Sequence, residues 1–305
     1  MMSCADPEGE ASGDAGQWQS DAAPGGTVLA PGLYVVATPI GNLGDVTLRA
    51  LEVLRGADLL ACEDTRVTAK LLARYAIKKP TTPYHDANAE QARPRLLAQL
   101  RQGARIALVS DAGTPLISDP GYKLVREAVA AGVAVVPVPG ASSVLAALMV
   151  AGLPTDRFLF VGFLPSRQGQ RIRALEEVRA VPATLVVLES THRLAESLAD
   201  MAATLGPREA VVARELTKRF EEAVRAPLPD LAARYAAQGD PKGEVVVVIA
   251  PPGEEAAVAD DATVDALLSD QLLTLRPSDA AALVAQKTGR PRREVYARAM
   301  ALRKR

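Results

Sequence analysis

Short apolar runs alternate with longer segments of helical period along residues 33–151. The short runs predict strands, and the segments whose apolar residues recur every three or four positions predict helices. The expected strands are residues 33–37, 59–62, 105–109 and 133–136, and the expected helices are residues 47–55, 67–74, 89–101, 122–131 and 142–151. Alternation of this kind is typical of a largely parallel sheet that is covered by helices on both faces.

A second set of elements follows a Gly- and Pro-containing break at residues 152–157. The expected strands are residues 158–161, 184–188, 210–214, 220–226 and 243–249, and the expected helices are residues 168–179, 192–205 and 228–237. Some consecutive strands have no helix between them, so part of this sheet is expected to be antiparallel. The pattern predicts an α/β protein with two tandem α/β domains, residues 31–152 and 153–250, and a cofactor cleft between them.

The two ends of the chain have a different composition. Residues 1–30 are rich in Gly, Ala, Ser and Asp and predict a disordered tail. Residues 251–276 are acidic and rich in Ala, as expected for a linker or a loosely held helix. Residues 277–305 predict a small C-terminal helical element of two short helices, with Ser278 as the N-cap of the first and Gly289 as its C-terminal stop.

The formal net charge of -1 hides an uneven distribution of charge. Residues 287–305 hold eight basic residues against one acid, whereas residues 251–286 hold seven acids against one base. The basic end permits a polyanionic partner, and a basic helix pair can equally serve packing or dimerisation. Both interpretations stay open on the sequence alone.

Few residues could bind a metal or form a disulfide. Cys4 and Cys62 stand alone, and His85 and His192 are the other soft ligands, so neither a zinc site nor a disulfide framework is expected. No apolar segment approaches the roughly 18 residues of a membrane helix. The first 30 residues also lack the pattern of a secretory signal. These features predict a cytoplasmic protein without a membrane span.

Three segments rich in Gly and Pro follow predicted strands: ATPIGNLGD at 37–45, SDAGTPLISDPG at 110–121 and PVPGASS at 137–143. Ligands of open α/β sheets collect beyond the carboxyl ends of the strands. Gly and Pro set turns and expose backbone polar groups to a ligand. None of the segments contains a lysine or either of the glycine-rich phosphate-binding motifs, which favours a ligand of low or mixed charge. Asp111 could accept a hydrogen bond from an ammonium or hydroxyl of that ligand.

Seven motifs, in order, resemble one enzyme family. They read LYVVATPIGNLGDVTLRALEVLRGADLLACEDTRVT, ALVSDAGTPLISDPGYKLV, VPVPGASSVLAAL, GLPTDRFLFVGFLP, ESTHRL, VARELTKRFEE and PKGEVVVVI. Together they resemble the bacterial 16S ribosomal RNA cytidine 2'-O-methyltransferases, which belong to the tetrapyrrole-methylase-like superfamily of S-adenosylmethionine enzymes. The resemblance covers about residues 33–250, and the C-terminal helix pair resembles the small domain that ends many members. The chain departs from the family pattern at Ala87, where histidine is usual, and at Thr191, where proline is usual.

The resemblance implies a set of cofactor-binding residues in the three segments. They are Pro39, Gly41, Asp111, Ala112, Gly113, Ser142 and Ser143. It also implies S-adenosylmethionine as the cofactor and 16S ribosomal RNA or the small ribosomal subunit as the partner. A homodimer is expected, and no metal is expected.

The chemistry asks for a base or a cation beside the nucleophile. The methyl group of a sulfonium is already a strong electrophile, so the enzyme must align the ribose hydroxyl and remove its proton. The candidate catalytic residues are Asp64, Glu189, His192 and Lys218, with His85 also considered as a base. Asp64 is equally suited to capping a helix, and His192 to opening one. The candidate RNA-binding residues are Arg66, His85, Arg214, Arg219, Arg292 and Arg293.

The sequence therefore predicts S-adenosylmethionine-dependent 2'-O-methylation of a cytidine ribose in 16S ribosomal RNA. One alternative keeps the fold and methylates a tetrapyrrole or another small molecule. A second alternative is a non-catalytic RNA-binding assembly factor.

Overall fold

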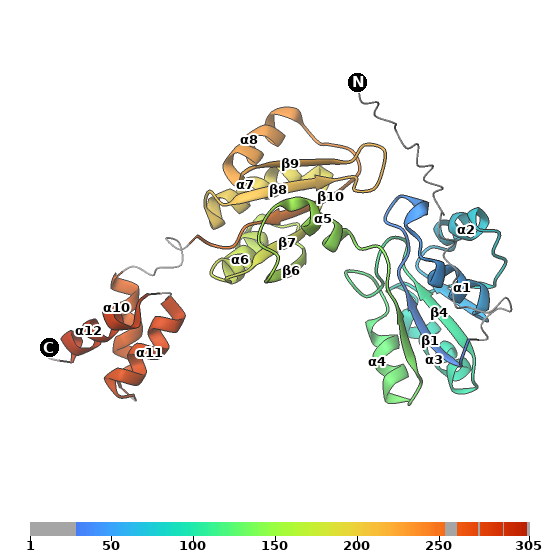
Figure 1. Ribbon diagram of the computed structural model, residues 1–305, viewed down its shortest axis with the longest axis horizontal. Helices are drawn as coiled ribbons and strands as arrows, with labels where there is room; N and C mark the ends of the chain where they lie inside the picture. Colours follow the sequence, from blue (N-terminus) through green and yellow to red (C-terminus); the bar gives the residue numbers. More distant parts are fainter. Residues whose placement is uncertain (1–28, 254–260, 274, 289, 304–305) are drawn as a thin grey trace, which may run out of the picture. The chain divides into compact units, whose positions relative to one another are not determined.

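The computed structural model describes residues 29–253, 261–273, 275–288 and 290–303 (Figure 1). The chain divides into two compact units. The first unit holds Thr47–Val109 and Gly121–Val138 together with the start of the first strand, and the second holds Val36–Val46, Ser110–Pro120 and the chain from Pro139 onward. Most of the predicted tail, residues 1–28, lies outside the described residues.

The first unit is built on a five-stranded sheet with the strand order β3-β2-β4-β1-β5. Its strands are β1 (Gly32–Val36), β2 (Leu59–Cys62), β3 (Thr81–Pro83), β4 (Arg105–Val109) and β5 (Val135–Val138), and its helices are α1 (Leu48–Gly56), α2 (Thr65–Arg74), α3 (Ala89–Arg101) and α4 (Tyr122–Ala130). β2 runs parallel to both β3 and β4. The predicted strands and helices are found, with ends that shift by at most two residues. β3 was missed because its three residues are exposed or half-buried and carry no apolar alternation.

The second unit contains a mixed sheet with the strand order β6-β7-β10-β8-β9. Its strands are β6 (Phe158–Phe163), β7 (Thr184–Ser190), β8 (Glu209–Arg214), β9 (Glu222–Pro227) and β10 (Glu244–Ile249), and its helices are α5 (Ser143–Ala151), α6 (Gln168–Val178), α7 (Leu194–Leu205) and α8 (Leu228–Gln238). β6 and β7 are parallel, whereas β10 is antiparallel to β7 and β8, and β8 is antiparallel to β9. The predicted antiparallel part of this sheet is confirmed.

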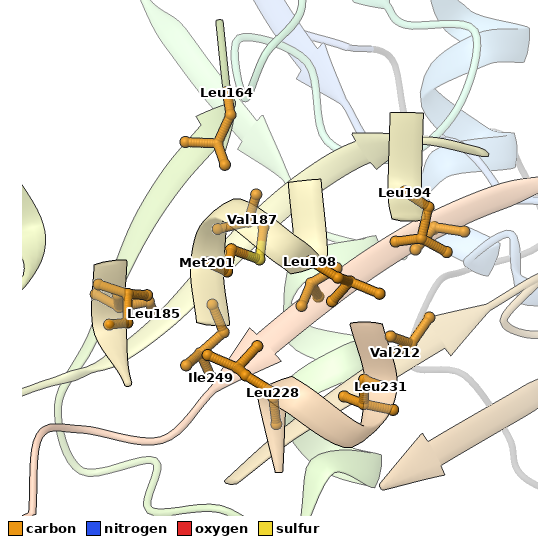
Figure 2. Packing of buried hydrophobic residues seen from close by; sticks show 14 of the residues in the cluster. Leu164, Leu185, Val187, Leu194, Leu198, Met201, Val212, Leu228, Leu231 and Ile249 are labelled. Atoms are coloured by element: carbon orange, nitrogen blue, oxygen red, sulfur yellow. The ribbon is translucent and has the colours of Figure 1, made fainter. Parts of the chain in front are cut away.

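The central strand β10 explains why this sheet is covered on both faces. Its residues alternate between two apolar clusters, since successive side chains of a strand point to opposite faces. Val245, Val247 and Ile249 belong to a cluster with α6, α7 and α8, part of which is shown in Figure 2. Val246 and Val248 belong to a second cluster with α5. The sequence boundaries put α5 in the first domain, but its apolar residues pack on the second sheet.

A three-helix element ends the chain: α10 (Asp261–Gln271), α11 (Pro277–Thr288) and α12 (Arg292–Leu302). The two predicted helices are observed, and α10 occupies part of the segment expected to be a linker or loosely held helix. Its Val264 and Leu268 are fully buried with residues of α11 and α12. The helix α11 begins at Pro277, two residues before the start that an N-cap at Ser278 requires, because proline suits the first helical turn. Gly289 lies outside the described residues.

Ion pairs join the acidic α10 to the basic α12. Arg298 binds Asp265 at 2.7 Å and Asp261 at 2.7 Å, and Arg290 binds Asp261 at 2.5 Å. The side chain of Arg290 is only 14% exposed. Part of the positive charge of the C-terminal end is therefore neutralised inside the element. In the part of the chain that the structure describes, no helix is long and apolar enough to cross a membrane.

We expect Leu268→Ala to weaken the three-helix element by about 2–5 kcal/mol, because it removes a buried side chain from a small core. Hydrogen exchange of peptides from α10, α11 and α12 measures this loss. Leu273→Ala is the matched control, since Leu273 is 82% exposed. Unchanged protection in the Leu268 variant would show that α10 is not part of the element's core.

Candidate functional site

The three Gly- and Pro-rich loops are joined to one another by hydrogen bonds. The backbone N–H of Thr38 donates to the Gly113 carbonyl at 2.9 Å, and the N–H of Gly113 donates to the Thr38 carbonyl at 3.0 Å. The Thr38 hydroxyl donates to the carbonyl of Ser110, and the Ser110 hydroxyl donates to that of Gly113. Thr114 Oγ1 donates to the Ala141 carbonyl at 3.2 Å. The loops thus form one assembly within the second unit.

This assembly borders a cavity of about 380 Å³. The cavity is lined by the three loops and by residues in or next to β6, β7 and β10, namely Ile40, Asp111, Ala112, Ile117, Ser118, Asp119, Ser143, Phe163, Leu188, Glu189, Ser190, Thr191, Gly243, Glu244, Val245 and Val246. Four of these residues are acidic, and none of the described residues that line the cavity is a lysine or an arginine. The lining therefore favours a ligand that carries positive charge.

Five of the seven predicted cofactor-binding residues either line the cavity or are buried next to residues that line it. Asp111, Ala112 and Ser143 line the cavity directly. Pro39 and Gly113 are buried, and Gly113 has a φ of +86°. Glycine adopts such a backbone conformation without strain, and Gly113 makes the contact between the first and second loops.

The N-terminus of α5 forms the third side of this assembly. Ser142 is its N-cap, and the Ser142 hydroxyl accepts a hydrogen bond from the Leu145 N–H at 3.4 Å. Ser143 is the first helical residue and lines the cavity. Backbone N–H groups at a helix start are unsatisfied within the helix, so this end suits the polar or anionic part of a ligand.

Lys218 lies against Gly41. A Cβ atom on Gly41 would come within 2.4 Å of Lys218 Cε and 2.5 Å of its Cγ, and the φ of Gly41 is +146°. Only glycine combines this backbone conformation with room for the lysine stem. Gly41 therefore leaves room for Lys218, and it is not among the residues that line the cavity.

Two carboxylates hold the ammonium of Lys218. Its Nζ lies 2.8 Å from Glu215 Oε1 and 3.2 Å from Glu244 Oε2, and Glu244 lines the cavity. Burial lowers the pKa of Lys218, but the hydrogen bonds and ion pairs with the two glutamates outweigh burial and raise that pKa above 10.5. The hydrogen bond from Lys218 also lowers the pKa of Glu215. These partners therefore favour the charged form of Lys218.

Glu189 is buried at the end of β7. Its carboxylate accepts hydrogen bonds from the Ser197 hydroxyl at 2.5 Å and the Ser190 N–H at 2.7 Å, and it pairs with Arg193 at 2.7 Å. These three partners satisfy most of the hydrogen-bonding capacity of the carboxylate. Glu189 thus fixes the wall of the cavity between β7 and α7.

His192 points to solvent, with its side chain 83% exposed. Its Nδ1 lies 3.1 Å from Asp240 Oδ2, and His192 is part of the 3-10 turn that precedes α7. The adjoining Thr191, one of the two family departures, is buried and lines the cavity. The other departure, Ala87, is exposed in the first unit.

Asp64 and Arg66 belong to the first unit. Asp64 is the N-cap of α2, and its carboxylate accepts a hydrogen bond from the Arg66 N–H at 2.8 Å. The Arg66 guanidinium, 2.6 Å from that carboxylate, and the Arg66 N–H lower the pKa of Asp64 to about 2. A carboxylate with so low a pKa is a weak base, which favours the capping role among the two that the sequence allowed. His85 is half-buried, and its backbone N–H donates a hydrogen bond to Oδ1 of Asn88 near the start of α3.

The other candidate RNA-binding residues differ in their exposure to solvent and in their bonds to other residues. Arg214 pairs with Glu222 at 3.1 Å and donates to the Lys242 carbonyl, so it holds β8, β9 and the turn before β10 together. Arg219 is exposed and lies 5.5 Å from the ring centre of the exposed Phe220. Arg292 and Arg293 are exposed in the first turn of α12.

Sequence reasoning missed part of the cavity lining. Leu116 and Ser118 in the second loop have positive φ values of 76° and 61°, which are unusual for residues other than glycine. Strained backbone of this kind clusters at functional sites. The residues Ile117, Asp119, Gly243 and Glu244 were also not singled out. Only their place in two of the motifs, LISDP and PKGE, could have pointed to them.

No group of three His, Cys, Asp or Glu side chains suited to a metal ion occurs among the described residues. The cavity carboxylates do not converge into such a group.

Solved methyltransferases share this two-sheet fold. A family model described as Tetrapyrrole (Corrin/Porphyrin) Methylases matches residues 32–232, and a second, described as RsmI C-terminal HTH domain, matches residues 258–303. The crystal structure of uroporphyrin-III C-methyltransferase from Thermus thermophilus complexed with S-adenyl homocysteine has a similar fold. Its TM-score is 0.50 and its identity is 23%, over 72% of this chain and 96% of its own length.

Two curated relatives are much closer in sequence. Ribosomal RNA small subunit methyltransferase I of Mesorhizobium japonicum is 53% identical over 90% of this chain and 93% of its own length. The protein of the same name from Escherichia coli O157:H7 is 48% identical over 87% of this chain and 93% of its own. The chain therefore belongs to the tetrapyrrole methylase family, within the group of ribosomal RNA small subunit methyltransferase I proteins, and is a methyltransferase. The resemblance predicted from the seven motifs is confirmed.

We expect Gly41→Ala to destabilise the second unit by about 1–3 kcal/mol, because a Cβ would collide with the Lys218 stem and strain the backbone. Denaturant unfolding measures the change in the free energy of unfolding. Gly169→Ala in α6 is the control, since nothing lies within 4 Å of its added Cβ. Equal stabilities of the Gly41 variant and the parent would contradict the close contact between Gly41 and Lys218.

Proposed function

We propose that the protein transfers a methyl group from S-adenosylmethionine to the 2'-hydroxyl of a cytidine ribose in 16S ribosomal RNA. The observation that carries the proposal is the acidic, loop-built cavity in a chain that is 53% identical to a ribosomal RNA small subunit methyltransferase. The cytidine and its 2'-hydroxyl rest on the motif resemblance.

The cavity residues fit S-adenosylmethionine. Bound there, this cofactor would supply an electrophilic methyl group on a positively charged sulfur. Asp111 and Asp119 suit its sulfonium and ammonium groups, and Ser143 at the start of α5 suits its carboxylate or ribose hydroxyls. The volume of about 380 Å³ is in the usual range for a cofactor site. No step of this binding calls for a metal.

Lys218 is proposed to stabilise the negative charge that develops on the ribose oxygen while the O–C bond forms, the S–C bond of the cofactor breaks and the hydroxyl proton leaves to water. Its ammonium stays charged at neutral pH and is fixed by Glu215 and Glu244, so no reorganisation is needed when negative charge develops on the hydroxyl oxygen. Glu244 connects this cation to the cavity, since it both binds Lys218 and lines the cavity wall. Among the four candidate catalytic residues, Lys218 thus has the best-supported role. Glu189 is proposed as a positioning residue.

Contacts with the RNA are proposed for exposed cations on two elements. Arg219 and Phe220 form an exposed cation–aromatic pair that could contact both phosphate and base. Arg292 and Arg293 begin α12, which is the third helix of the part that matches the RsmI C-terminal HTH domain and the second helix of the α11–α12 pair. In helix-turn-helix proteins the first residues of the second helix approach the nucleic acid. Arg290 is proposed for stability and not for RNA contact, because it is paired and largely buried.

The proposal includes a cytoplasmic location, because ribosomal subunits are the substrate. It also includes a homodimer, which rests on the resemblance alone and which sedimentation can test. Neither alternative function has comparable support. The solved uroporphyrin-III C-methyltransferase shares only the fold, at 23% identity, and a non-catalytic factor does not fit a chain that belongs to a methyltransferase family.

We expect loss of the gene to remove one 2'-O-methyl group from 16S RNA, and the intact gene to restore it. Lys218→Met should fail to restore methylation, with a loss of about 10²–10³ in kcat, because an alkoxide-stabilising cation is removed. Lys218→Arg should restore it in part. Mapping of ribose methylation measures each outcome, and cofactor affinity of the methionine variant should change little. An unchanged methylation pattern after gene loss would refute the proposed function.

We expect S-adenosylmethionine to bind with equal affinity in buffer and in a chelator, and Asp111→Asn to weaken it about tenfold by removing a cavity charge. Isothermal titration calorimetry measures both. Asp240→Asn is the control, because Asp240 pairs with His192 and does not belong to the cavity lining. Binding that disappears in the chelator and returns with added metal would contradict the metal-free site.

A further inference from the structure

A stripe of basic residues follows the solvent-facing side of α2. Arg66, Lys70 and Arg74 are spaced four residues apart and are exposed, and Lys78 extends the series beyond the helix end. The residues Thr68, Leu71 and Leu72 form the buried face of the same helix. Four-residue spacing puts the three helical cations on one face, about 6 Å apart along the axis. We call these four residues the α2 stripe.

The α2 stripe works against the stability of its own helix. The sequence of α2, TRVTAKLLAR, contains no acid, so the like charges at four-residue spacing repel one another. The helix dipole disfavours Arg66 in the first turn and favours Arg74 in the last turn. Within the described parts of the chain, Lys70, Arg74 and Lys78 form no ion pair. Packing of α2 therefore does not explain why the stripe is present.

The surrounding unit strengthens the field of the stripe. The described residues of the first unit contain thirteen Lys and Arg and seven Asp and Glu. Three of those acids, Asp58, Asp64 and Glu127, are already engaged by arginines. A surplus of positive charge attracts a polyanion and raises its rate of association.

The stripe also begins at the edge of the first sheet where β2 and β4 end. α2 starts just after β2 ends, and β4 runs parallel to β2. β4 ends at the same edge, and the chain continues there into Ser110–Pro120, the second cofactor loop. Arg66 thus lies at the edge of the sheet from which that loop departs, and the stripe runs from there toward the opposite edge, where β3 begins.

We propose that the α2 stripe binds the phosphate backbone of the RNA substrate. The proposal rests on the proposed function and adds a binding surface to it. Lysine and arginine at a regular spacing of about 6 Å suit successive phosphates along one strand, and such contacts position the RNA without reading its sequence. The stripe would hold a length of RNA whose target nucleotide is read elsewhere.

The test compares two triple variants with the parent chain. The stripe variant is Lys70→Gln, Arg74→Gln and Lys78→Gln. The control variant is Arg101→Gln, Lys123→Gln and Arg126→Gln, which removes the same charge from exposed positions of α3 and α4 in the same unit. Binding to purified small ribosomal subunits is measured across a salt series, with S-adenosylmethionine affinity and thermal unfolding as further readouts.

Three phosphate contacts should contribute roughly 2–3 to the slope of log affinity against log salt, and the stripe variant should lose that much. Its affinity at about 0.1 M salt should fall on the order of 10- to 100-fold. The control should keep the parental slope, and both variants should bind the cofactor normally. The stripe variant should unfold at the same or a higher temperature than the parent, since a repulsion is removed.

Equal losses in the two variants would show a general effect of net charge and overturn the proposal. An unchanged slope in the stripe variant would also overturn it, while methylation of subunits by the parent chain would leave the proposed function intact. Failure of the parent chain to bind or methylate subunits would refute the proposed function itself. The measurements on the parent chain therefore distinguish failure of the stripe proposal from failure of the proposed function.

Discussion

The reciprocal pair of backbone hydrogen bonds between Thr38 and Gly113 is the constraint on which the site depends. It joins two segments that lie 75 residues apart in sequence and that both leave strands of the first sheet. The hydroxyls of Thr38 and Ser110 reinforce the pair, and Thr114 extends it to the third loop. Backbone groups that bond to each other in this way are satisfied without water. The Gly and Pro residues can therefore set the turns of the loops without large side chains to hold them. This explains how loops with so few large side chains hold a defined cavity.

A second network, of ion pairs and close contacts, fixes the charged residues of the site. Lys218 is confined on one side by Gly41 and on the other by Glu215 and Glu244. Glu215 has a φ of +51° and packs on Gly243, where a Cβ would lie 2.3 Å from its carboxylate. The Glu244 N–H also donates to the Glu215 carboxylate. Two glycines and one strained glutamate thus keep a single cation in place, which is the kind of preorganisation that lowers the cost of charge development.

Much of the fold could be predicted from the sequence, because the apolar pattern is local. β2, β4 and α3 have the predicted ends, since runs such as LLAC are bounded by polar residues on both sides. β3 lacked such a pattern, and α10 required partners from far along the chain. Arg290 shows the same limit, since eight bases in the last nineteen residues look like one patch until Asp261 and Glu294 are found beside one of them.

The loops of the site could be predicted from the sequence, but the roles of its charged residues could not, because those roles depend on the partners that folding brings to each side chain. Loop composition indicated where a ligand could bind, and Asp111, Ala112 and Ser143 do line the cavity. The function of a charged side chain, however, depends on its partners. Asp64, Glu189 and Lys218 are all plausible acid–base groups in sequence, yet Arg66 lowers the pKa of Asp64, three donors satisfy most of the capacity of Glu189, and two glutamates favour the charged form of Lys218. A cation held ready beside an acidic cavity, rather than a free base within it, is the arrangement that these partners leave for the chemistry.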